Sequence, residues 1–413
     1  MAAPLHGIRV VDLTMVWAGP FGTRMLGDYG AEIIKVEAPA QWDLLRALGL
    51  IQRDEPRWYN KSAYFNHNNR DKYSFALDLR QQEGREVLLD LCRKSDIIVE
   101  NFRTDVMDNL GLSYDAVREA NPNIIYVSMP GHGKSGPEKD YVAYGSNVEQ
   151  LAGLVSLSGY ENGEPMKTGF SYGDPMAGTA LVGAVCLALR KRRLEGHGSY
   201  VELAQRENLT MFVGEWLVDY SMNGKQRRPI GNRHPHMAPH NRYPSAGRDA
   251  WITIACQDDA EFMALAKAIG QPELAEDPRF ATAAGRKEHE AELDEAIEAW
   301  TSQRGHYEAM HILQRFGVTA GAVLTIPELM SDPQLRHRGA WVEQTHPDAG
   351  TWEMEAPPWL LSRTPGHIRM SGPCFGEHNS YVLRDVLGYD EDRIAQLYAK
   401  AVTADDPDES LHR

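Results

Sequence analysis

The chain contains two short β-branched runs, Ile8-Arg-Val-Val-Asp-Leu13 and Ala31-Glu-Ile-Ile-Lys-Val36, on either side of a segment with helical spacing. The pair Gly19-Pro20 ends the first run, and apolar residues then recur at helical spacing from Phe21 to Tyr29. Short apolar runs that are joined through a helix are typical of parallel strands buried on both faces. This stretch therefore predicts a strand–helix–strand unit.

Similar runs follow at Asp96 to Val99 and at Ile124 to Met129, and helical stretches such as Gly84 to Lys94 separate them. Alternation of buried strands with helices is typical of α/β proteins. We therefore expect a parallel sheet within residues 1–205, the first part of a large domain. Small and apolar residues from Met176 to Arg190 predict a further helix that packs closely against its neighbours.

The composition changes beyond this region. A Gly-, Arg-, Pro- and His-rich stretch, Gly224 to Pro244, is followed by one strand at Trp251 to Cys256 and by charged helices. We expect a smaller α+β domain over residues 225–325. Gly376 to Leu397 predicts an amphipathic helix. We expect residues 330–400 to return to the large domain and residues 401–413 to form a flexible acidic tail.

The bulk composition excludes several classes of protein. Apolar residues make up 42% of the chain and charged residues 24%, as in ordinary globular proteins. The net charge of −15 argues against a nucleic-acid partner, because nucleic-acid surfaces need clustered Lys and Arg.

The cysteines and the hydropathy indicate a cytoplasmic protein. The 4 cysteines are widely spaced and form no Cys-x-x-Cys pair. The first residues lack the basic and apolar regions of a signal peptide, and no apolar stretch is long enough to span a membrane. We therefore expect no membrane partner and no export.

Two motifs have an obvious functional interpretation that their context does not support. Gly131-His-Gly-Lys-Ser-Gly136 matches the dinucleotide fingerprint, but Pro137 follows and no apolar helix begins there. His234, His236 and His240 lie close together, but the intervening prolines and the missing further ligands argue against a metal site. We expect no metal.

The tripeptide Gly173-Asp174-Pro175 has both a structural and a chemical interpretation. Judged by local pattern, Asp174 is a favoured helix N-cap and Pro175 suits the first helical position. A carboxylate at a helix N-terminus can also be a positioned nucleophile, with a glycine beside it that lets a substrate approach. The pattern alone favours the cap.

Short motifs in a common order give the chain a resemblance to one family. The sequence resembles the class III CoA transferases, typified by formyl-CoA transferase, carnitine CoA-transferase and bile-acid CoA transferases. The matching pieces span nearly the whole chain: Leu5 to Leu13, Ala18 to Pro20, Leu26 to Glu37, Glu100 to Arg103, Asn121-Pro122, Gly131 to Pro137, Gly173 to Pro175, Gly196 to Leu203, Gly231 to Pro235 and Gly376 to Asn379.

The resemblance implies an α/β fold with a Rossmann-like large domain that both chain ends build and a smaller α+β domain between them. It implies a homodimer of interlocked rings, or a heteromer with a paralogous subunit. It also implies that Asp174 attacks an acyl-CoA donor to give an aspartyl anhydride and then an aspartyl-CoA thioester, from which a carboxylic acid takes the CoA. CoA thioesters are then substrates, and no permanent cofactor is needed.

The resemblance also implies roles for individual residues. Val16 and Ala18 should lie beside the thiol end of CoA, and Asn101, Phe102 and Arg103 should hold its nucleotide and pantetheine portions. The candidates for the acyl pocket are Trp17, Tyr144, Glu149 and His240.

Departures from the family pattern bear on the substrate. Trp17 stands where formyl-CoA transferase carries Gln, Ala38 stands where it carries Arg, and Gly231 to His240 replaces its glycine-rich gating loop. Oxalate and formate therefore look like the wrong substrates. We expect a larger or more apolar acyl group, with succinyl-CoA as donor and an aromatic or branched acid as acceptor, as in succinyl-CoA:benzylsuccinate CoA-transferase.

Two alternatives stay open at this point. An α-methylacyl-CoA racemase needs a His where this chain has Tyr144, and a phenol with a pKa of about 10 is a poor general base. A CoA-binding subunit of a heteromeric transferase would not need a nucleophile, and the presence of Asp174 argues against it.

Overall fold

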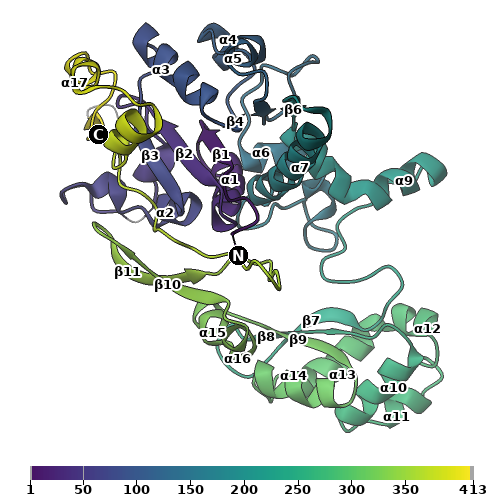
Figure 1. Cartoon of the computed structure of the whole chain (residues 1–413). Helices are drawn as coiled ribbons and strands as arrows, with labels where there is room; N and C mark the ends of the chain where they lie inside the picture. Colours follow the sequence, from purple (N-terminus) through teal and green to yellow (C-terminus); the bar gives the residue numbers. More distant parts are fainter. Residues whose placement is uncertain (1, 50, 410–413) are drawn as a thin grey trace. The chain divides into compact units, whose positions relative to one another are not determined.

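A computed structural model describes residues 2–49 and 51–409 (Figure 1). The chain divides into two compact units. The larger unit combines 1–155, 167–226 and 336–413, and the smaller unit combines 156–166 and 227–335.

The larger unit is built on a six-stranded parallel sheet with the order β3-β2-β1-β4-β5-β6. The α/β class predicted from the sequence is confirmed, and four of the strands were expected; the two outer ones, β3 and β6, were not. The strands are β1 (Arg9–Asp12), β2 (Glu32–Glu37), β3 (Lys72–Ala76), β4 (Ile97–Glu100), β5 (Ile125–Ser128) and β6 (Tyr200–Glu202).

Alternate side chains of the sheet point into two separate cores. Val10, Ile33 and Ile97 pack on one face, against α1 (Ala18–Asp28) and α7 (Gly173–Glu195). The following residues, such as Val11, pack on the other face, against α3 (Gln82–Arg93) and other elements. Because successive side chains of a strand point to opposite faces, a continuous apolar run is buried on both sides.

The remaining helices of the larger unit are mostly short. They are α2 (Ala63–Asn69), α4 (Val106–Asn109), α5 (Tyr114–Ala120), α6 (Gly145–Leu151), α8 (Gln205–Thr210), α9 (Gly214–Asn223), a π-helical turn (Tyr381–Val386) and α17 (Glu391–Ala399). The last two elements supply Val382, Leu383 and Leu397 to the core shared with α3. The C-terminal part of the chain thereby completes one layer of the unit.

A two-stranded hairpin, β10 (Trp341–His346) and β11 (Gly350–Glu355), also belongs to the larger unit. Glu355 on β11 forms ion pairs with Arg24 at 2.6 Å and with Arg70 at 3.4 Å. Burial would raise the pKa of Glu355, but His67 and these two guanidinium groups hold it well below its usual range. The carboxylate therefore ties the hairpin to α1 and to the end of α2.

The acidic tail departs from the expected flexibility over its described part. Val402 and Thr403 are fully buried, and the Val402 carbonyl accepts a hydrogen bond from the Asp78 N–H at 2.8 Å. The Trp58 indole N–H donates to Glu409 at 2.9 Å. Apolar anchors and hydrogen bonds thus fix a segment whose composition alone suggested disorder; residues 410–413 lie outside the described residues.

The smaller unit carries an antiparallel sheet with the order β7-β8-β9 and a set of helices. Its strands are β7 (His240–Pro244), β8 (Trp251–Ala255) and β9 (Thr319–Val323). Its helices are α10 (Asp259–Ala268), α11 (Glu273–Glu276), α12 (Ala283–Glu288), α13 (Glu290–Thr301), α14 (His306–Arg315) and α15 (Ile326–Ser331), and α16 (Pro333–His337) runs across the boundary. No helix in the described part of the chain is long and apolar enough to cross a membrane.

Removing one partner of a buried ion pair should destabilise the fold more than removing one partner of an exposed pair. Glu37 and Arg46 are both fully buried, with the Arg46 Nη2 atom 2.8 Å from Glu37 Oε2. We expect Glu37→Ala to lower the free energy of unfolding by about 3–5 kcal/mol, because it leaves a buried guanidinium without its partner. Chemical denaturation followed by circular dichroism measures this change.

The exposed pair Arg336–Glu353 in the same unit provides the control. Glu353→Ala should change the unfolding free energy much less, because water already screens that pair. Equal effects of the two substitutions would contradict the structural role of Glu37.

Candidate active site

A cavity of about 670 Å³ lies at the carboxyl ends of β1 and β4. Its wall includes residues 15–18, which follow β1, and residues 101–106, which follow β4. The strand order reverses between these two strands. Ligands of open parallel sheets bind at such a reversal, outside the carboxyl ends of the strands.

The cavity brings together most of the site residues expected from the sequence. Eight of the ten expected residues lie among the described residues that line the cavity: Val16, Trp17, Ala18, Asn101, Phe102, Arg103, Tyr144 and Asp174. Glu149 and His240 are not among the described residues that line it.

Asp174 does not act as the helix cap that the local pattern favoured. Helix α7 begins at Gly173, its N-cap is Tyr172, and Asp174 lies inside the first turn. The Ala18 backbone N–H instead faces the Asp174 carboxylate and lowers its pKa. The cap interpretation was wrong because a residue distant in sequence takes up the side chain.

A close crossing of α1 and α7 makes this contact possible. A Cβ on Gly22 would lie 2.5 Å from the Gly178 carbonyl oxygen, and a Cβ on Gly178 would lie 2.6 Å from the Ala18 carbonyl oxygen. Real Cβ atoms do not approach backbone this closely, so only glycine fits at either position. The two glycines therefore let the N-terminus of α1 approach the first turn of α7.

A third glycine gives the carboxylate its space. A Cβ on Gly145, the first residue of α6, would lie 1.9 Å from Asp174 Oδ2. Any larger residue at this position would displace the Asp174 carboxylate. Sequence reasoning missed this role, although Gly145 directly follows the expected site residue Tyr144.

The pKa of Asp174 is raised to about 6. Burial is the largest cause, the nearby Glu149 carboxylate adds to it, and the hydrogen bond from Ala18 acts in the opposite direction. A carboxylate that is partly desolvated yet ionised at neutral pH is suited to nucleophilic attack.

Glu149 lies behind the cavity wall. Its side chain is buried, and Oε1 accepts a hydrogen bond from the Gly173 N–H at 2.9 Å. Glu149 thus satisfies a backbone donor at the start of α7 that has no partner within the helix. The structure gives it an electrostatic role toward Asp174 and does not place it in the acyl pocket.

Asn101 lines the cavity but uses its amide for the neighbouring loop. Its Oδ1 accepts from the Met15 N–H at 2.8 Å, and its Nδ2 donates to the Met15 carbonyl at 2.9 Å. The side chain thereby links the loops that follow β4 and β1.

Basic residues gather in the cavity wall. Arg103, expected from the sequence, is joined by Arg80 and Lys139. The Arg103 side chain is 57% exposed, and its Nη2 atom lies 3.8 Å from Asp105, so it is available to an anionic ligand. Arg80 and Lys139 were missed because each is an isolated basic residue without a motif.

An aromatic pair lies near Asp174. The rings of Trp17 and Tyr64 meet edge to face with their centroids 5.4 Å apart. Burial raises the pKa of Tyr64 to about 12, and the charge of Asp174 adds to that rise. Tyr64, on α2, therefore lies near the carboxylate, although no sequence motif indicated this.

His240 belongs to the smaller unit. It begins β7, and its Nδ1 donates to the Asn232 carbonyl at 2.8 Å. His234 and His236 contact each other through their rings. Among residues 2–49 and 51–409, no group of three or more His, Cys, Asp and Glu side chains is arranged to hold a metal ion.

Most of the chain matches one known family. The model of CoA-transferase family III covers residues 5–379. The chain belongs to CoA-transferase family III. The resemblance inferred from the short motifs is thereby confirmed, and the protein is a CoA-transferase whose substrates are CoA thioesters and carboxylic acids.

Relatives and solved structures of the family agree over nearly the full length. The succinyl-CoA–D-citramalate CoA-transferase of Chloroflexus aurantiacus is 36% identical, over 97% of this chain and 98% of the relative. The succinate–glutarate CoA-transferase of Agrobacterium fabrum is 32% identical, over 93% and 96%. A CAIB/BAIF family protein from Brucella suis has a TM-score of 0.85 and 30% identity, over 94% of this chain and 100% of the other.

The Asp174–Glu149 pair predicts the pH dependence of this CoA-transferase. The raised pKa means that the Asp174 carboxylate forms as pH rises through about 6, and we expect kcat/KM for CoA transfer to rise over the same interval. Glu149→Gln removes the neighbouring negative charge. It should therefore lower the pKa of Asp174 and move the rising limb to lower pH.

Initial rates measured across this pH range test the shift. Glu83→Gln on α3 is the control, because that exposed carboxylate pairs with Lys400. The electrostatic role of Glu149 is contradicted if the pH at which kcat/KM rises is the same in Glu149→Gln as in the wild type. It is also contradicted if that pH shifts equally in both variants.

Proposed function

We propose that this CoA-transferase works through covalent intermediates on Asp174. The observation that carries the proposal is the placement of a half-buried carboxylate with raised pKa in the wall of the cavity. Gly145 leaves room for the carboxylate, and the Ala18 N–H faces it. These are the conditions under which a weak nucleophile becomes effective.

The first half of the proposed reaction frees the donor acid. A carboxylate oxygen of Asp174 attacks the thioester carbonyl carbon, the carbon–sulfur bond breaks, and CoA leaves as thiolate. The product is an acyl-aspartyl anhydride. The thiolate then attacks the Asp174 carbonyl carbon, which releases the donor carboxylate and leaves an aspartyl-CoA thioester.

The second half reverses these steps with the acceptor. The acceptor carboxylate attacks the aspartyl-CoA carbonyl carbon and displaces CoA thiolate, which gives a second anhydride. The thiolate attacks the acceptor carbonyl carbon of that anhydride. The new acyl-CoA leaves, and the Asp174 carboxylate is restored without net uptake of a proton.

In this proposal CoA lies along the cavity with its acyl end at Asp174. Val16 and Ala18 border the thiol end, and Phe102 with the aliphatic part of the wall contacts the pantetheine portion. Arg103, Arg80 and Lys139 supply positive charge for the phosphates. Such local charge is needed because the chain as a whole is acidic.

For substrates we propose succinyl-CoA as donor and a branched or aromatic acid as acceptor. Relatives whose names include succinyl-CoA with D-citramalate, and succinate with glutarate, support the donor and a dicarboxylic acceptor, and D-citramalate is branched. Trp17 and Tyr144 supply aromatic surface to the cavity wall. An aromatic wall favours a larger acyl group over oxalate or formate.

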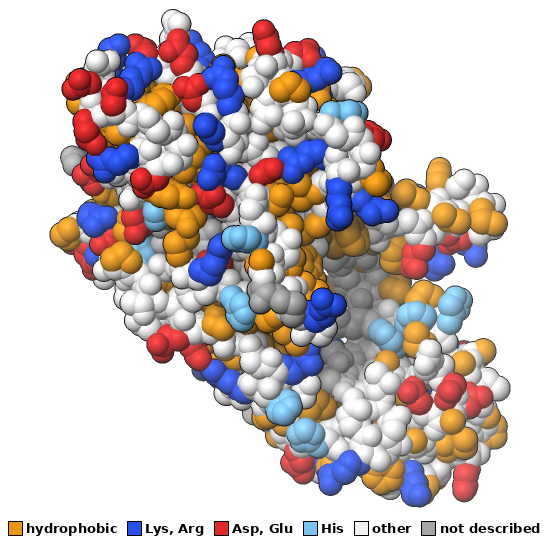
Figure 2. Space-filling view, viewed as in Figure 1, with side chains coloured by type: hydrophobic (Ala, Val, Ile, Leu, Met, Phe, Trp, Pro, Cys, Tyr) orange, Lys and Arg blue, Asp and Glu red, His pale blue; other side chains and the backbone are white. Residues whose placement is uncertain are grey.

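The proposal includes a dimer of two copies of the chain. Hydrophobic side chains gather over α9 (Figure 2). Side chains on and next to this helix are mostly exposed: Met211 (77%), Leu217 (51%), Val218 (57%), Tyr220 (62%) and Met222 (76%). Exposed apolar surface of this kind marks a protein–protein interface.

The proposal also places the enzyme in the cytoplasm. All four cysteines, Cys92, Cys186, Cys256 and Cys374, are free thiols. Unpaired cysteines fit a reducing compartment.

Covalent capture tests the nucleophile. Incubation with succinyl-CoA followed by hydroxylamine should leave a hydroxamate on the peptide that contains Asp174, because hydroxylamine attacks both the anhydride and the thioester. Peptide mass mapping detects the product. Asp174→Ala should show no such mass and no CoA transfer while retaining its circular dichroism spectrum.

A folded Asp174→Ala protein with full transfer activity would rule out the covalent role. Labelling of a different carboxylate in the wild-type protein would identify that residue as the nucleophile in place of Asp174.

Light scattering tests the assembly. On size-exclusion chromatography with light-scattering detection, the isolated protein should have a molar mass twice the 46.3 kDa of one chain. We expect a dimer because it covers the apolar surface of α9. A monomer that becomes active only with a second, paralogous chain would instead support a heteromer; one relative carries the name succinyl-CoA–L-malate CoA-transferase beta subunit.

A further inference from the structure

The loop that joins β1 to α1 is held by side chains from several separate segments. The Asp12 carboxylate accepts from the Thr14 N–H at 2.9 Å, and Lys35 Nζ donates to the Thr14 carbonyl at 2.7 Å. Asn101 binds both the N–H and the carbonyl of Met15. Consecutive backbone groups of the loop are therefore satisfied by side chains that belong to the sheet and its edge.

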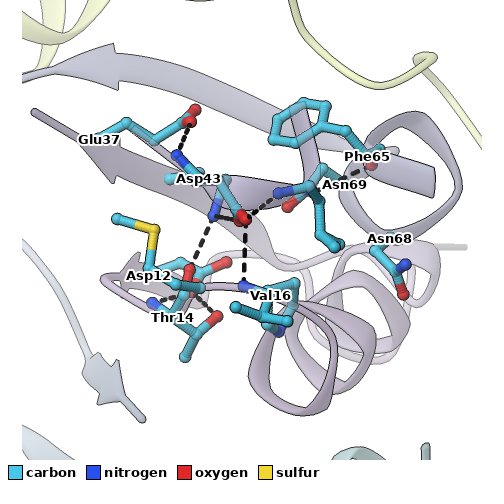
Figure 3. Close-up of polar contacts among 12 residues, drawn as sticks. Asp12, Thr14, Val16, Glu37, Asp43, Phe65, Asn68 and Asn69 are labelled. Atoms are coloured by element: carbon cyan, nitrogen blue, oxygen red, sulfur yellow. Dashed lines mark hydrogen bonds and ion pairs between the residues drawn. The ribbon is translucent and has the colours of Figure 1, made fainter. Parts of the chain in front are cut away.

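The next residue of this loop has a strained backbone. Val16 has a φ of 66°, in the left-handed region that β-branched residues rarely adopt. Such strain persists only where the surrounding structure determines the conformation, and it is concentrated at functional sites. Asp43 supplies that constraint, because its Oδ1 accepts a hydrogen bond from the Val16 N–H at 3.1 Å (Figure 3).

Asp43 is itself firmly held. Its side chain is fully buried, and its Oδ2 lies 2.9 Å from Lys35 Nζ, which is also fully buried. Its Oδ1 accepts from the Leu45 N–H at 3.0 Å, and its own N–H donates to Glu37 Oε1 at 3.0 Å. These contacts fix the carboxylate at the start of the short 3-10 helix Leu44–Ala47.

Asp43 lies behind the cavity and does not line it. Its neighbours Trp42 and Leu44 are in the described wall, whereas Asp43 is not. Asp43 contacts the loop that borders the cavity through its bond to the Val16 N–H. The residue two positions beyond Val16 is Ala18, whose N–H faces the Asp174 carboxylate and lowers its pKa.

We propose that Asp43 is a positioning residue for CoA transfer: it holds Val16 in the left-handed conformation and thereby directs the Ala18 N–H at the Asp174 carboxylate. The inference rests on the proposed role of Asp174. Rotation at Val16 would displace Ala18, and a misplacement of about 1 Å far from the chemistry can lower a rate about 100-fold.

Asp43→Ala tests the proposal against a matched control. Asp71 is also a fully buried carboxylate, and it accepts backbone N–H bonds from Arg369 at 2.7 Å and from Met370 at 2.9 Å. Asp71→Ala therefore removes a similar set of contacts away from the loop. We expect Asp43→Ala to lower kcat about 100-fold, with a smaller change in KM for acyl-CoA, while Asp71→Ala keeps its kcat.

A second comparison separates positioning from loss of stability. Glycine adopts a φ of 66° without strain, so Val16→Gly should make the loop less dependent on Asp43. The fold-loss in kcat caused by Asp43→Ala should therefore be smaller in a Val16→Gly background than in the wild type. Asp43→Asn, which retains an acceptor oxygen, should lose less activity than Asp43→Ala.

The titration of Asp174 is a readout that does not depend on turnover. Its carboxyl carbon, followed by ¹³C NMR, should titrate at a higher pH in Asp43→Ala, because the Ala18 N–H bond that lowers the pKa is lost. Glu149 and Tyr64, the other titratable groups near Asp174, are unchanged in this variant. Asp71→Ala should not change the pH at which Asp174 titrates.

The proposal is overturned if folded Asp43→Ala keeps the kcat of Asp71→Ala, or if the Asp174 titration does not move. The proposal is also contradicted if Asp43→Ala lowers kcat by the same factor in the Val16→Gly background as in the wild type. A wild-type protein that forms no hydroxamate on Asp174 would count against the proposed function, while the titration would still show whether Asp43 directs the Ala18 N–H.

Discussion

Helices α1 and α7 cross so closely at Gly22 and Gly178 that a side chain at either position would collide with backbone of the other helix. The rest of the site depends on this crossing. It brings the first residue of α1, Ala18, to the first turn of α7, where Asp174 lies. Both helices pack on one face of the sheet, so the rigid layer below them sets the distance between the amide and the carboxylate.

The carboxyl edge of the sheet contains an unusual number of buried charges for a structural core. Asp12 pairs with Lys72, Lys35 with Asp43, and Glu37 with Arg46, and all six side chains are fully buried. Buried ion pairs contribute little net stability because desolvation offsets their attraction. Their value here is geometric, since they present fixed acceptors and donors to the loop that leads into α1.

Opposing influences set the state of Asp174. Burial and Glu149 raise its pKa, and the Ala18 N–H acts against them. A fully solvated carboxylate would be ionised but weakly nucleophilic, and a fully buried one without a donor would stay protonated. Near neutral pH the Asp174 carboxylate is therefore both partly desolvated and ionised. These two properties suit the proposed attack on a thioester.

Much of the fold followed from the sequence. Continuous apolar runs such as Ile97 and Ile98 with their neighbours predicted central parallel strands, because residues on both faces of such strands must be apolar. The outer strand β3 was missed, because its Lys72 and Ser74 break the apolar run and are satisfied only by tertiary partners. The tail was misjudged for the same reason: Val402 finds its pocket only in the folded protein.

The sequence determined the family and pointed to Asp174 as the candidate nucleophile, because short motifs keep their order along the chain. It could not determine what Asp174 contacts, since a local pattern reports only local partners and favoured a helix cap. The approach of Ala18, the space left by Gly145, and the nearness of Tyr64 arise from segments far apart in the chain. Only tertiary packing decides these contacts, because the distances between helices depend on which side chains fit between them.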